Sequence, residues 1–267
     1  MSTASAATTI PKDLKRSGPQ SEALMNRRKF LKQSCALLSG TAGTLSLPVL
    51  NSCQTSRVSA SQDLPNPRWG MVVDVRKCRE GCTVCTDACR QENNVAFHGD
   101  KRWDVHWIRK VKLTNPEDQV EKALPLLCNH CDNPPCAQVC PVQATYKRRD
   151  GIVIIDHHRC IGCRYCMIAC PYNARYFNFK ENPEWPNHKY PKRSHGVAES
   201  CNFCAHRVER GQLPACVEAC GRMKVNALVF GDLNDPESEP VKLIAENPVK
   251  RIREDFGTEP KVYYIGL

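Results

Sequence analysis

The sequence lacks the short motifs that accompany most enzyme chemistry. It contains no nucleophile elbow, no phosphate-binding loop and no dinucleotide fingerprint. It also has no C-x-x-C-H run, which attachment of a c-type haem requires, because Ala205 separates Cys204 from His206. From residue 61 onward no apolar run is long enough to cross a bilayer. We therefore expect no catalytic residues. Cysteine is unusually abundant, so any functional chemistry is expected to depend on the cysteines.

The 18 cysteines follow a regular spacing. The run RCIGCRYCMIACPYNA holds Cys160, Cys163, Cys166 and Cys170, and Pro171 follows directly. In bacterial ferredoxins with this spacing, three thiolates bind one [4Fe-4S] cluster and the fourth reaches a neighbouring cluster. Three more quartets repeat the pattern with one gap widened: Cys78, Cys82, Cys85 and Cys89; Cys128, Cys131, Cys136 and Cys140; and Cys201, Cys204, Cys216 and Cys220. Sixteen cysteines thus fall into quartets, the number that four [4Fe-4S] clusters need.

Two other uses of cysteine compete with this interpretation. Paired C-x-x-C units also build structural zinc sites, which would make the chain a zinc-stabilised assembly protein with no redox role. A zinc site, however, has no need of compact runs that end in Cys-Pro, as at Cys140 and Cys170. Disulfide scaffolds rarely repeat one tight spacing, and cysteines three residues apart would have to pair with distant partners. Iron-sulfur clusters therefore remain the leading interpretation.

The first 60 residues are typical of an export signal. Residues 26–32 (NRRKFLK) form a twin-arginine motif, and a moderately apolar stretch follows over residues 35–50. Residues 58–60 (VSA) form a candidate cleavage site, which would discard Cys35 and Cys53 with the signal; a retained signal would instead be an anchor. Because the twin-arginine route carries folded proteins, clusters can be inserted before export. We expect the protein on the periplasmic side of the cytoplasmic membrane.

The charge argues against nucleic acid as a partner. The whole chain has a formal charge of +10, but the first 60 residues hold eight Lys or Arg and two acids, which leaves +4 for residues 61–267. Each oxidised cluster with four thiolates adds about −2, so the loaded protein carries about −4. A local basic run such as residues 147–149 is usually a solvated face.

Short elements separated by turn residues predict an α+β fold with short strands, short helices and long loops. We expect strands over residues 71–75, 103–113, 227–230 and 262–265. A helical turn over residues 83–90 would carry Cys85 and Cys89 on adjacent faces. A hairpin over residues 145–156 would turn at Gly151 and join the second quartet to the third.

A hairpin flanked by two cysteine quartets is a ferredoxin-like duplication. The chain contains this pattern twice, with one copy nested inside the other. The quartet order, the inner Cys-Pro endings and ALVFGDLNDPES at 227–238 resemble the four-cluster subunits of the NrfC, PsrB and DmsB types, which accompany molybdopterin oxidoreductases and NrfD-type membrane proteins. Within that group, KCREGCTVC at 77–85, PLLCNHCDNPPC at 125–136 and GTEPKVYYI at 257–265 are most similar to DsrO, the exported iron-sulfur subunit of the sulfite-reductase-associated DsrMKJOP membrane complex.

This resemblance implies two nested ferredoxin-like domains. The outer domain comprises residues 61–115 and 195–235, the inner domain residues 116–194, and a C-terminal tail residues 236–267. The resemblance also implies crossed ligands, because a fourth cysteine one helical turn beyond the third points at the other cluster. The four implied iron-ligand sets are Cys78, Cys82, Cys85 and Cys220; Cys201, Cys204, Cys216 and Cys89; Cys128, Cys131, Cys136 and Cys170; and Cys160, Cys163, Cys166 and Cys140.

Residues beside the cysteines distinguish the two domains. Pro141 and Pro171 follow the inner quartets and redirect the chain, whereas Arg90 and Gly221 stand at the equivalent outer positions. We therefore expect the outer clusters to be more exposed or differently tuned. His130, inside the second quartet, is a candidate for tuning a cluster potential, with simple packing as the alternative.

The implied function is electron transfer. The resemblance predicts an electron-transfer subunit that links a quinone-reactive, NrfD-type integral membrane subunit to other redox subunits of a sulfur-metabolism complex, among them a multihaem c-type cytochrome. The alternative is the four-cluster beta subunit of a molybdopterin oxidoreductase, of the polysulfide or dimethyl sulfoxide reductase type. Either way, membrane attachment would come through partners.

Overall fold

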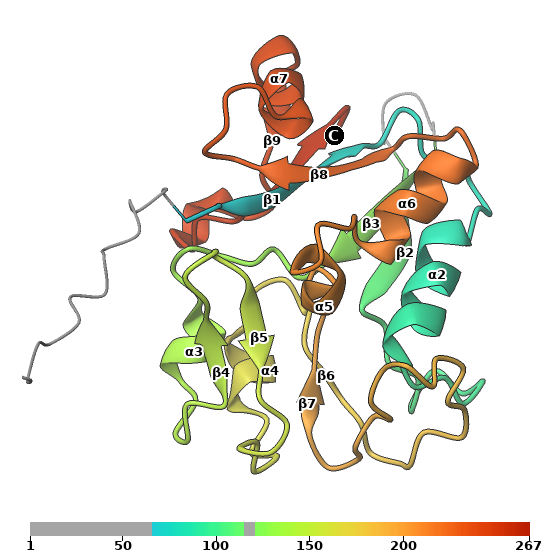
Figure 1. Cartoon of the computed structure of the whole chain (residues 1–267), viewed down its shortest axis with the longest axis vertical. Coiled ribbons are helices and arrows are strands. Elements are labelled where there is room, and N and C mark those ends of the chain that lie inside the picture. Colours follow the sequence, from blue (N-terminus) through green and yellow to red (C-terminus); the bar gives the residue numbers. More distant parts are fainter. Residues whose placement is uncertain (1–65, 115–120) are drawn as a thin grey trace, which may run out of the picture. The chain divides into compact units, whose positions relative to one another are not determined.

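The computed structural model describes residues 66–114 and 121–267, which lie in one compact unit (Figure 1). The twin-arginine motif, the candidate cleavage site, Cys35 and Cys53 lie outside the described residues and stay predictions. No helix in the described part is both long and apolar enough to cross a membrane.

A four-stranded sheet ties the two ends of the described chain together. Its order is β8 (Leu228–Asp232), β1 (Trp69–Asp74), β10 (Val262–Ile265) and β9 (Val249–Lys250). Strand β1 runs antiparallel to β8 and parallel to β10. The strands predicted over residues 71–75, 227–230 and 262–265 are therefore confirmed, within a residue or two at their ends.

Both faces of this sheet are buried. Val72, Val229 and Ile265 pack against Leu243 and Ile244 of helix α7 (Glu239–Glu246). The side chains that alternate with them, such as Met71, Val73, Phe230 and Tyr264, face the main core. Burial on both faces explains why the strand sequences are continuously apolar.

Helices α2 (Val84–Asn93) and α6 (Ala215–Arg222) lie side by side in Figure 1 and carry four of the outer cysteines. Neither Cys89 nor Cys220 is followed by proline, so each helix continues past its last cysteine. Helix α2 ends where Asn94 adopts the left-handed conformation with φ of 52°. The helical turn predicted over residues 83–90 is confirmed and is longer than expected.

The inner region contains two very short helices, α3 (Pro135–Gln138) and α4 (Tyr165–Ala169). Each ends before a Cys-Pro pair, because proline cannot continue a helix and restricts the residue before it. The predicted hairpin is confirmed as β4 (Thr145–Lys147) and β5 (Val153–Ile155).

The remaining elements connect these parts. Strands β2 (Ile108–Thr114) and β3 (Glu121–Leu127) form an antiparallel ribbon, and β6 (Tyr176–Phe177) pairs with β7 (Ala198–Glu199). Helix α5 (Ala205–Val208) and a 3-10 turn (Glu254–Phe256) complete the described part.

The strand predicted over residues 103–113 is wrong in its first half. Strand β2 begins only at Ile108, because the backbone N–H groups of Trp103 and Asp104 both donate to the carbonyl of Asp100 in a turn. The carboxylate of Asp104 then accepts the N–H groups of His98 and Gly99, which fixes an irregular loop.

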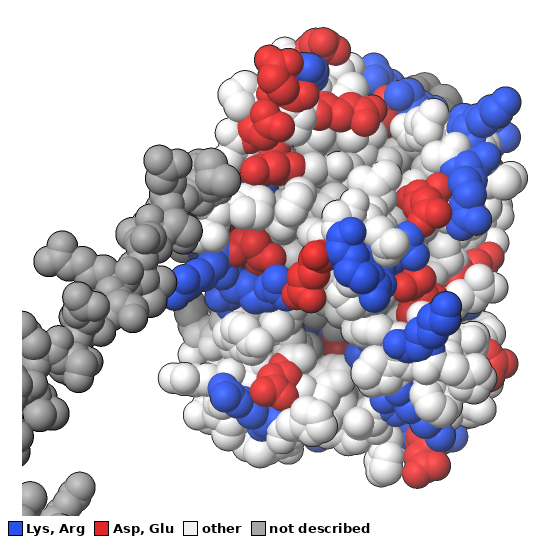
Figure 2. All heavy atoms as spheres, viewed as in Figure 1, with Lys and Arg blue, Asp and Glu red and all other residues white. Residues whose placement is uncertain are grey.

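Charges of both signs are interspersed over much of the face drawn in Figure 2. Acidic side chains gather at the end where α7 lies; Glu237, Glu239 and Glu246 belong to this helix and the turn before it.

Candidate iron-sulfur cluster sites

Two cavities are each lined by cysteines from two different sequence runs. In the inner region, Cys128, Cys131 and Cys136 share a cavity with Cys170 of the next run. Helix α3 carries Cys136, and Cys170 caps the C-terminus of α4 with an extended backbone that leads into Pro171. We call these four cysteines the inner central quartet.

The second cavity lies in the outer region. Cys78, Cys82 and Cys85 line it together with Cys220, which α6 brings from more than a hundred residues away in the chain. Lys110 also lines this cavity and opposes the effect of burial on the pKa of Cys78, which is nevertheless raised. We call these four cysteines the outer terminal quartet.

The other two groups of cysteines are recognised by their electrostatic influence on one another. Burial first, and then the neighbouring Cys204, Cys201 and Cys85, raises the pKa of Cys89 well above its usual range. Burial likewise raises the pKa of Cys216, and Cys204, Cys89 and Cys201 add to that effect. We call Cys89, Cys201, Cys204 and Cys216 the outer central quartet.

The inner terminal quartet comprises Cys140, Cys160, Cys163 and Cys166. Burial raises the pKa of Cys166 to about 11; Arg175 opposes the effect, and Cys136 of the inner central quartet, Cys160 and Cys140 add to it. Cys160 also packs against a small apolar cluster that contains Cys166. Cys163 lies before the start of α4 and is exposed, and the sequence pattern alone assigns it to this quartet.

These cysteines fit [4Fe-4S] clusters better than single metal ions. None of the sixteen cysteines in the described ranges forms a disulfide. Within those ranges no three His, Cys, Asp or Glu side chains converge closely enough to hold one ion, which is what a tetrahedral zinc site demands. Burial raises the pKa of Cys85 to about 11 and that of Cys201 to about 12, so a thiolate there needs a strong compensating positive charge. Iron supplies that charge when it is coordinated.

Two buried donors beside the cysteines also fit a sulfur-rich group. Nε of Arg175 and Nε2 of His130 are buried and have no hydrogen-bond partner in the described structure. Nδ1 of His130 accepts the N–H of Val153 at 3.0 Å, which assigns the proton of the neutral ring to Nε2. Burial lowers the pKa of His130 well below its usual value, so the ring stays neutral. Cluster sulfur would accept such donors.

Exposure differs strongly between the quartets. All four cysteines of each central quartet are buried. In the outer terminal quartet Cys78 and Cys82 are partly exposed, and in the inner terminal quartet Cys163 is fully exposed, with Cys140 and Cys160 partly so. The expectation that the outer clusters are the more exposed is therefore not met. Helices α2 and α6, which continue past Cys89 and Cys220, pack together and cover the outer cysteines.

The two central quartets meet through an aromatic stack. His130 lies between Cys128 and Cys131, and Phe203 lies between Cys201 and Cys204. Their rings are 3.7 Å apart between centroids, with an interplanar angle of 28°, and both side chains are fully buried. Packing therefore joins the inner and outer regions at two segments that carry cysteines of the central quartets.

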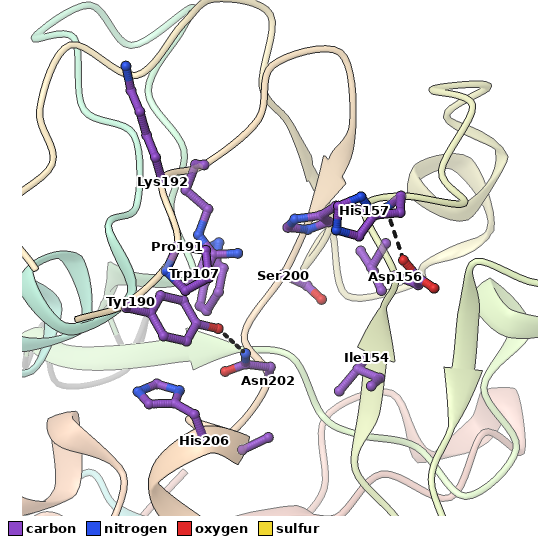
Figure 3. Close-up of a pocket in the computed structure, with 14 residues that line it drawn as sticks. Trp107, Ile154, Asp156, His157, Tyr190, Pro191, Lys192, Ser200, Asn202 and His206 are labelled. Atoms are coloured by element: carbon purple, nitrogen blue, oxygen red, sulfur yellow. Dashed lines mark hydrogen bonds between the residues drawn. The ribbon is translucent and has the colours of Figure 1, made fainter. Parts of the chain in front are cut away.

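A separate cavity of about 350 Å³, drawn in Figure 3, contains no cysteine. Tyr190, Asn202 and His206 line it near one another, and Asn202 donates to the Tyr190 hydroxyl at 3.3 Å. His157 lines it as well; burial lowers the pKa of this side chain to about 4, with Arg193 adding to the effect. His157 thus belongs to this polar cavity and not to a quartet.

The sequence interpretation missed two donors that touch cysteine sulfur. Arg175 donates from Nη2 to Sγ of Cys136 at 3.1 Å, and Asn93 donates from Nδ2 to Sγ of Cys204 at 3.4 Å. Asn93 follows Cys89 by four residues, so helical periodicity alone places it on the same face as that cysteine. No comparable rule indicates Arg175, because it follows Pro171 in an irregular segment.

An α+β chain with four such quartets is, by class, a ferredoxin-type protein that binds four [4Fe-4S] clusters. Comparison with known proteins agrees: the 4Fe-4S dicluster domain matches residues 119–232. The predicted fold class and the four clusters are thereby confirmed.

Relatives extend the match to nearly the whole chain. It is 44% identical over 272 residues to the Hdr-like menaquinol oxidoreductase iron-sulfur subunit 1 of Archaeoglobus fulgidus, covering 91% of this chain and 99% of the relative. It is 38% identical to a tetrathionate reductase subunit of Salmonella typhimurium, over 91% of this chain and 88% of the relative. Protein NrfC of Escherichia coli is 36% identical, over 90% of this chain and 95% of the relative. The chain belongs to the family of multi-cluster iron-sulfur electron-transfer subunits of oxidoreductase complexes.

Proposed function

We propose that this protein is an exported electron-transfer subunit that conducts electrons between an NrfD-type, quinone-reactive membrane subunit and other redox subunits of a sulfur-metabolism respiratory complex. The observation that carries the proposal is the burial pattern, in which both central quartets are fully buried and both terminal quartets are partly exposed. When bound, the clusters supply one-electron redox chemistry. Exposed ends and a buried middle suit a conductor that exchanges electrons with partners at each end and excludes water between them.

We assign the iron ligands to the four quartets defined above, so that every cluster borrows one cysteine from its neighbour's run. The cavities that join Cys170 to Cys128 and Cys220 to Cys78 support this crossed assignment. Each pair of clusters then shares two short segments, and the His130–Phe203 stack links one pair to the other. The resulting order is outer terminal, outer central, inner central, inner terminal.

The crossed assignment is tested by removing single ligands. Cys170→Ala should convert the inner central cluster to a three-iron form with its own paramagnetic signal and leave the inner terminal cluster with four irons. Cys140→Ala, the matched change, should do the reverse, and both variants should keep the outer pair. Loss of iron from the site of Cys160 and Cys166 in the Cys170→Ala protein would mean that each run closes its own cluster.

The surface around the inner terminal quartet supports a docking role toward the membrane subunit. Ile161, Tyr165 and Ile168 expose 64%, 57% and 83% of their surface. Cys163, which lies between Ile161 and Tyr165 in the sequence, is exposed as well. Exposed apolar side chains of this size around a redox centre are typical of an interaction site. The similarity to a menaquinol oxidoreductase subunit favours a quinone-reactive membrane protein as the occupant.

The function is tested on the complex purified from membranes in mild detergent. A menaquinol analogue should reduce the clusters, as followed by electron paramagnetic resonance, and an NrfD-type protein should co-purify. Ile168→Glu should lower co-purification and the rate of reduction at least tenfold with four clusters retained. The control is Leu213→Glu, an apolar residue 48% exposed in the loop before α6, which should change neither. Reduction of the Ile168→Glu protein at the normal rate contradicts the docking site, and no reduction of the unchanged complex contradicts the function.

The export proposal rests on the twin-arginine motif alone. Arg27→Lys combined with Arg28→Lys should leave cluster-loaded precursor in the cytoplasm, as measured by fractionation and immunoblotting. Normal export of the double variant would remove the argument for a periplasmic location.

A second candidate is the beta subunit of a molybdopterin oxidoreductase. The 38% identity to a tetrathionate reductase subunit over most of both chains favours it. The purified complex discriminates between the two: molybdenum in stoichiometric amount supports the beta-subunit role, whereas a multihaem c-type cytochrome without molybdenum supports the DsrO-like role.

A further inference from the structure

Arg175 lies at the junction of the two inner quartets. It directly precedes β6, and only 4% of the residue is exposed. Its Nη2 donates to Sγ of Cys136 at 3.1 Å, and its Nη1 donates to Oγ1 of Thr145 at 3.4 Å. The side chain lines the cavity of the inner central quartet, and its charge also reaches Cys166 of the inner terminal quartet.

The positive charge of Arg175 has no carboxylate to balance it among the residues that the structure describes. The ionisable groups whose negative form stabilises it are Cys136, Cys128, Cys166 and Cys170, as the thiolates that iron ligation requires. Burying a guanidinium without a counter-charge is strongly unfavourable, so a fold that keeps one must supply negative charge close by. Among the described residues, the groups placed to do so are cysteine sulfurs from both inner quartets.

Other buried cations in the described structure are balanced differently. The ammonium of Lys261 lies 3.2 Å from the carboxylate of Asp132. Arg193 has the buried Glu199 in its neighbourhood and lies over the ring of Trp107 at 4.6 Å. Each of these cations has an acidic partner or neighbour, which makes the environment of Arg175 distinct.

We propose that Arg175 sets the reduction potentials of the inner pair, raising both so that electrons within this chain collect there. The inference rests on the proposed electron-transfer function. A cluster that gains one electron becomes more negative by one charge, and a buried cation with a hydrogen bond to ligand sulfur favours that reduced form. Because the guanidinium contacts the inner central quartet and its charge also reaches Cys166, it attracts an electron placed on either inner cluster and offsets part of the cost of reducing both.

The test is a dithionite titration of the cluster-loaded protein, monitored by electron paramagnetic resonance with iron content measured on the same samples. Arg175→Met and Arg175→Gln remove the charge, and Arg175→Lys keeps it. Arg164→Gln is the matched control, because Arg164 lies between Cys163 and Cys166 in the sequence but is exposed, so solvent screens its charge.

We expect the Met and Gln variants to favour the oxidised form of the inner central cluster at least tenfold more than the unchanged protein, a lowering of about 59 mV for one electron. The Lys variant should keep most of the original potential, and Arg164→Gln should change it less than threefold. Equal potentials in all variants that retain four clusters would overturn the proposal while leaving electron conduction intact. Failure of all three Arg175 variants to hold the inner clusters would also overturn it, in favour of a purely structural role.

Discussion

The inner and outer pairs hold equal numbers of cysteines but face them with different groups. The inner pair has the buried guanidinium of Arg175 against Cys136. The outer pair has neutral donors at two buried sulfurs, the Asn93 amide at 3.4 Å from Cys204 and the backbone N–H of Ala227 at 3.3 Å from Cys220. Lys110, the cation beside Cys78 of the outer terminal quartet, is only half-buried. Charge-assisted hydrogen bonds are roughly twice as strong as neutral ones, so two halves of one duplicated fold become electrically unequal.

The apolar packing around the cysteines also differs between the two pairs, and here the outer pair has the stronger support. Four of the outer cysteines lie on α2 and α6 within the main core, which also holds Cys128 and Cys170 of the inner central quartet. Cys136 and Cys166, by contrast, belong to a small separate cluster. The inner pair is thus stabilised mainly by charge and tight turns, and the outer pair mainly by helix packing. Changes of the same kind should therefore have unequal effects in the two halves.

The largest expected contrast comes from removing one ligand in each half. Cys216 is only 4% exposed and has outer cysteines of both quartets around it, so Cys216→Ala should lower the free energy of unfolding by about 4 kcal/mol or more and release the outer pair. Cys163 is exposed, so Cys163→Ala should yield a folded protein with one three-iron cluster and a loss of about 1 kcal/mol. Iron content and thermal unfolding measure both, and equal destabilisation would break the comparison.

The features of the fold and of the cluster sites that the sequence predicted correctly depend on residues that are close together in the chain. Cysteine spacing predicted the four [4Fe-4S] clusters, and Asp150 with Gly151 predicted the hairpin, because both signals come from residues close together in the chain. Strand β3 was missed because Pro125 lies inside it and weakens the strand pattern, yet it pairs with Lys110 at one edge of a two-stranded ribbon.

Interactions across long stretches of chain were beyond the sequence pattern. Strand β10 was expected, but its segment was assigned to a separate tail; it pairs in parallel with β1, nearly two hundred residues earlier. Arg175 was not singled out, because its contact with Cys136 depends on how the segment after Pro171 folds back. The boundaries of the nested domains stay predictions.

A glycine in each half offers a second, smaller contrast. Gly151, in the inner hairpin, has φ of 80°, and an added Cβ would overlap Nζ of Lys261, which is fully buried and donates to the Gly151 carbonyl and to Asp132. Gly81, in the outer terminal loop, has φ of 69° with open space around it. Both changes to alanine cost about 1–2 kcal/mol of backbone strain. Gly151→Ala should cost about 1–3 kcal/mol more, because a buried ammonium loses its partners.

Chemical denaturation of the two loaded variants measures that difference. Since the backbone strain is common to both, the excess isolates the contact with Lys261. A Gly81→Ala protein as unstable as Gly151→Ala would show that the outer loop is as constrained as the inner hairpin.

The smallest expected effect concerns Asn93, the outer counterpart of Arg175. Its Nδ2 donates to Sγ of Cys204 at 3.4 Å and to the carbonyl of Cys89 at 3.2 Å, while its Oδ1 is buried without a partner in the described structure. Asn93→Leu keeps the volume but removes a neutral donor, so the outer central cluster should favour the oxidised form by less than tenfold. Its stability should change little, because the lost hydrogen bond is offset by removal of the unpaired oxygen.

The same titration used for Arg175 measures this shift. A change in the Asn93→Leu protein as large as that in Arg175→Gln would mean that hydrogen bonding alone sets the potentials. A smaller one would assign the difference between the pairs to the buried charge of Arg175, since both side chains donate to a cysteine sulfur but only the guanidinium brings a full positive charge with it.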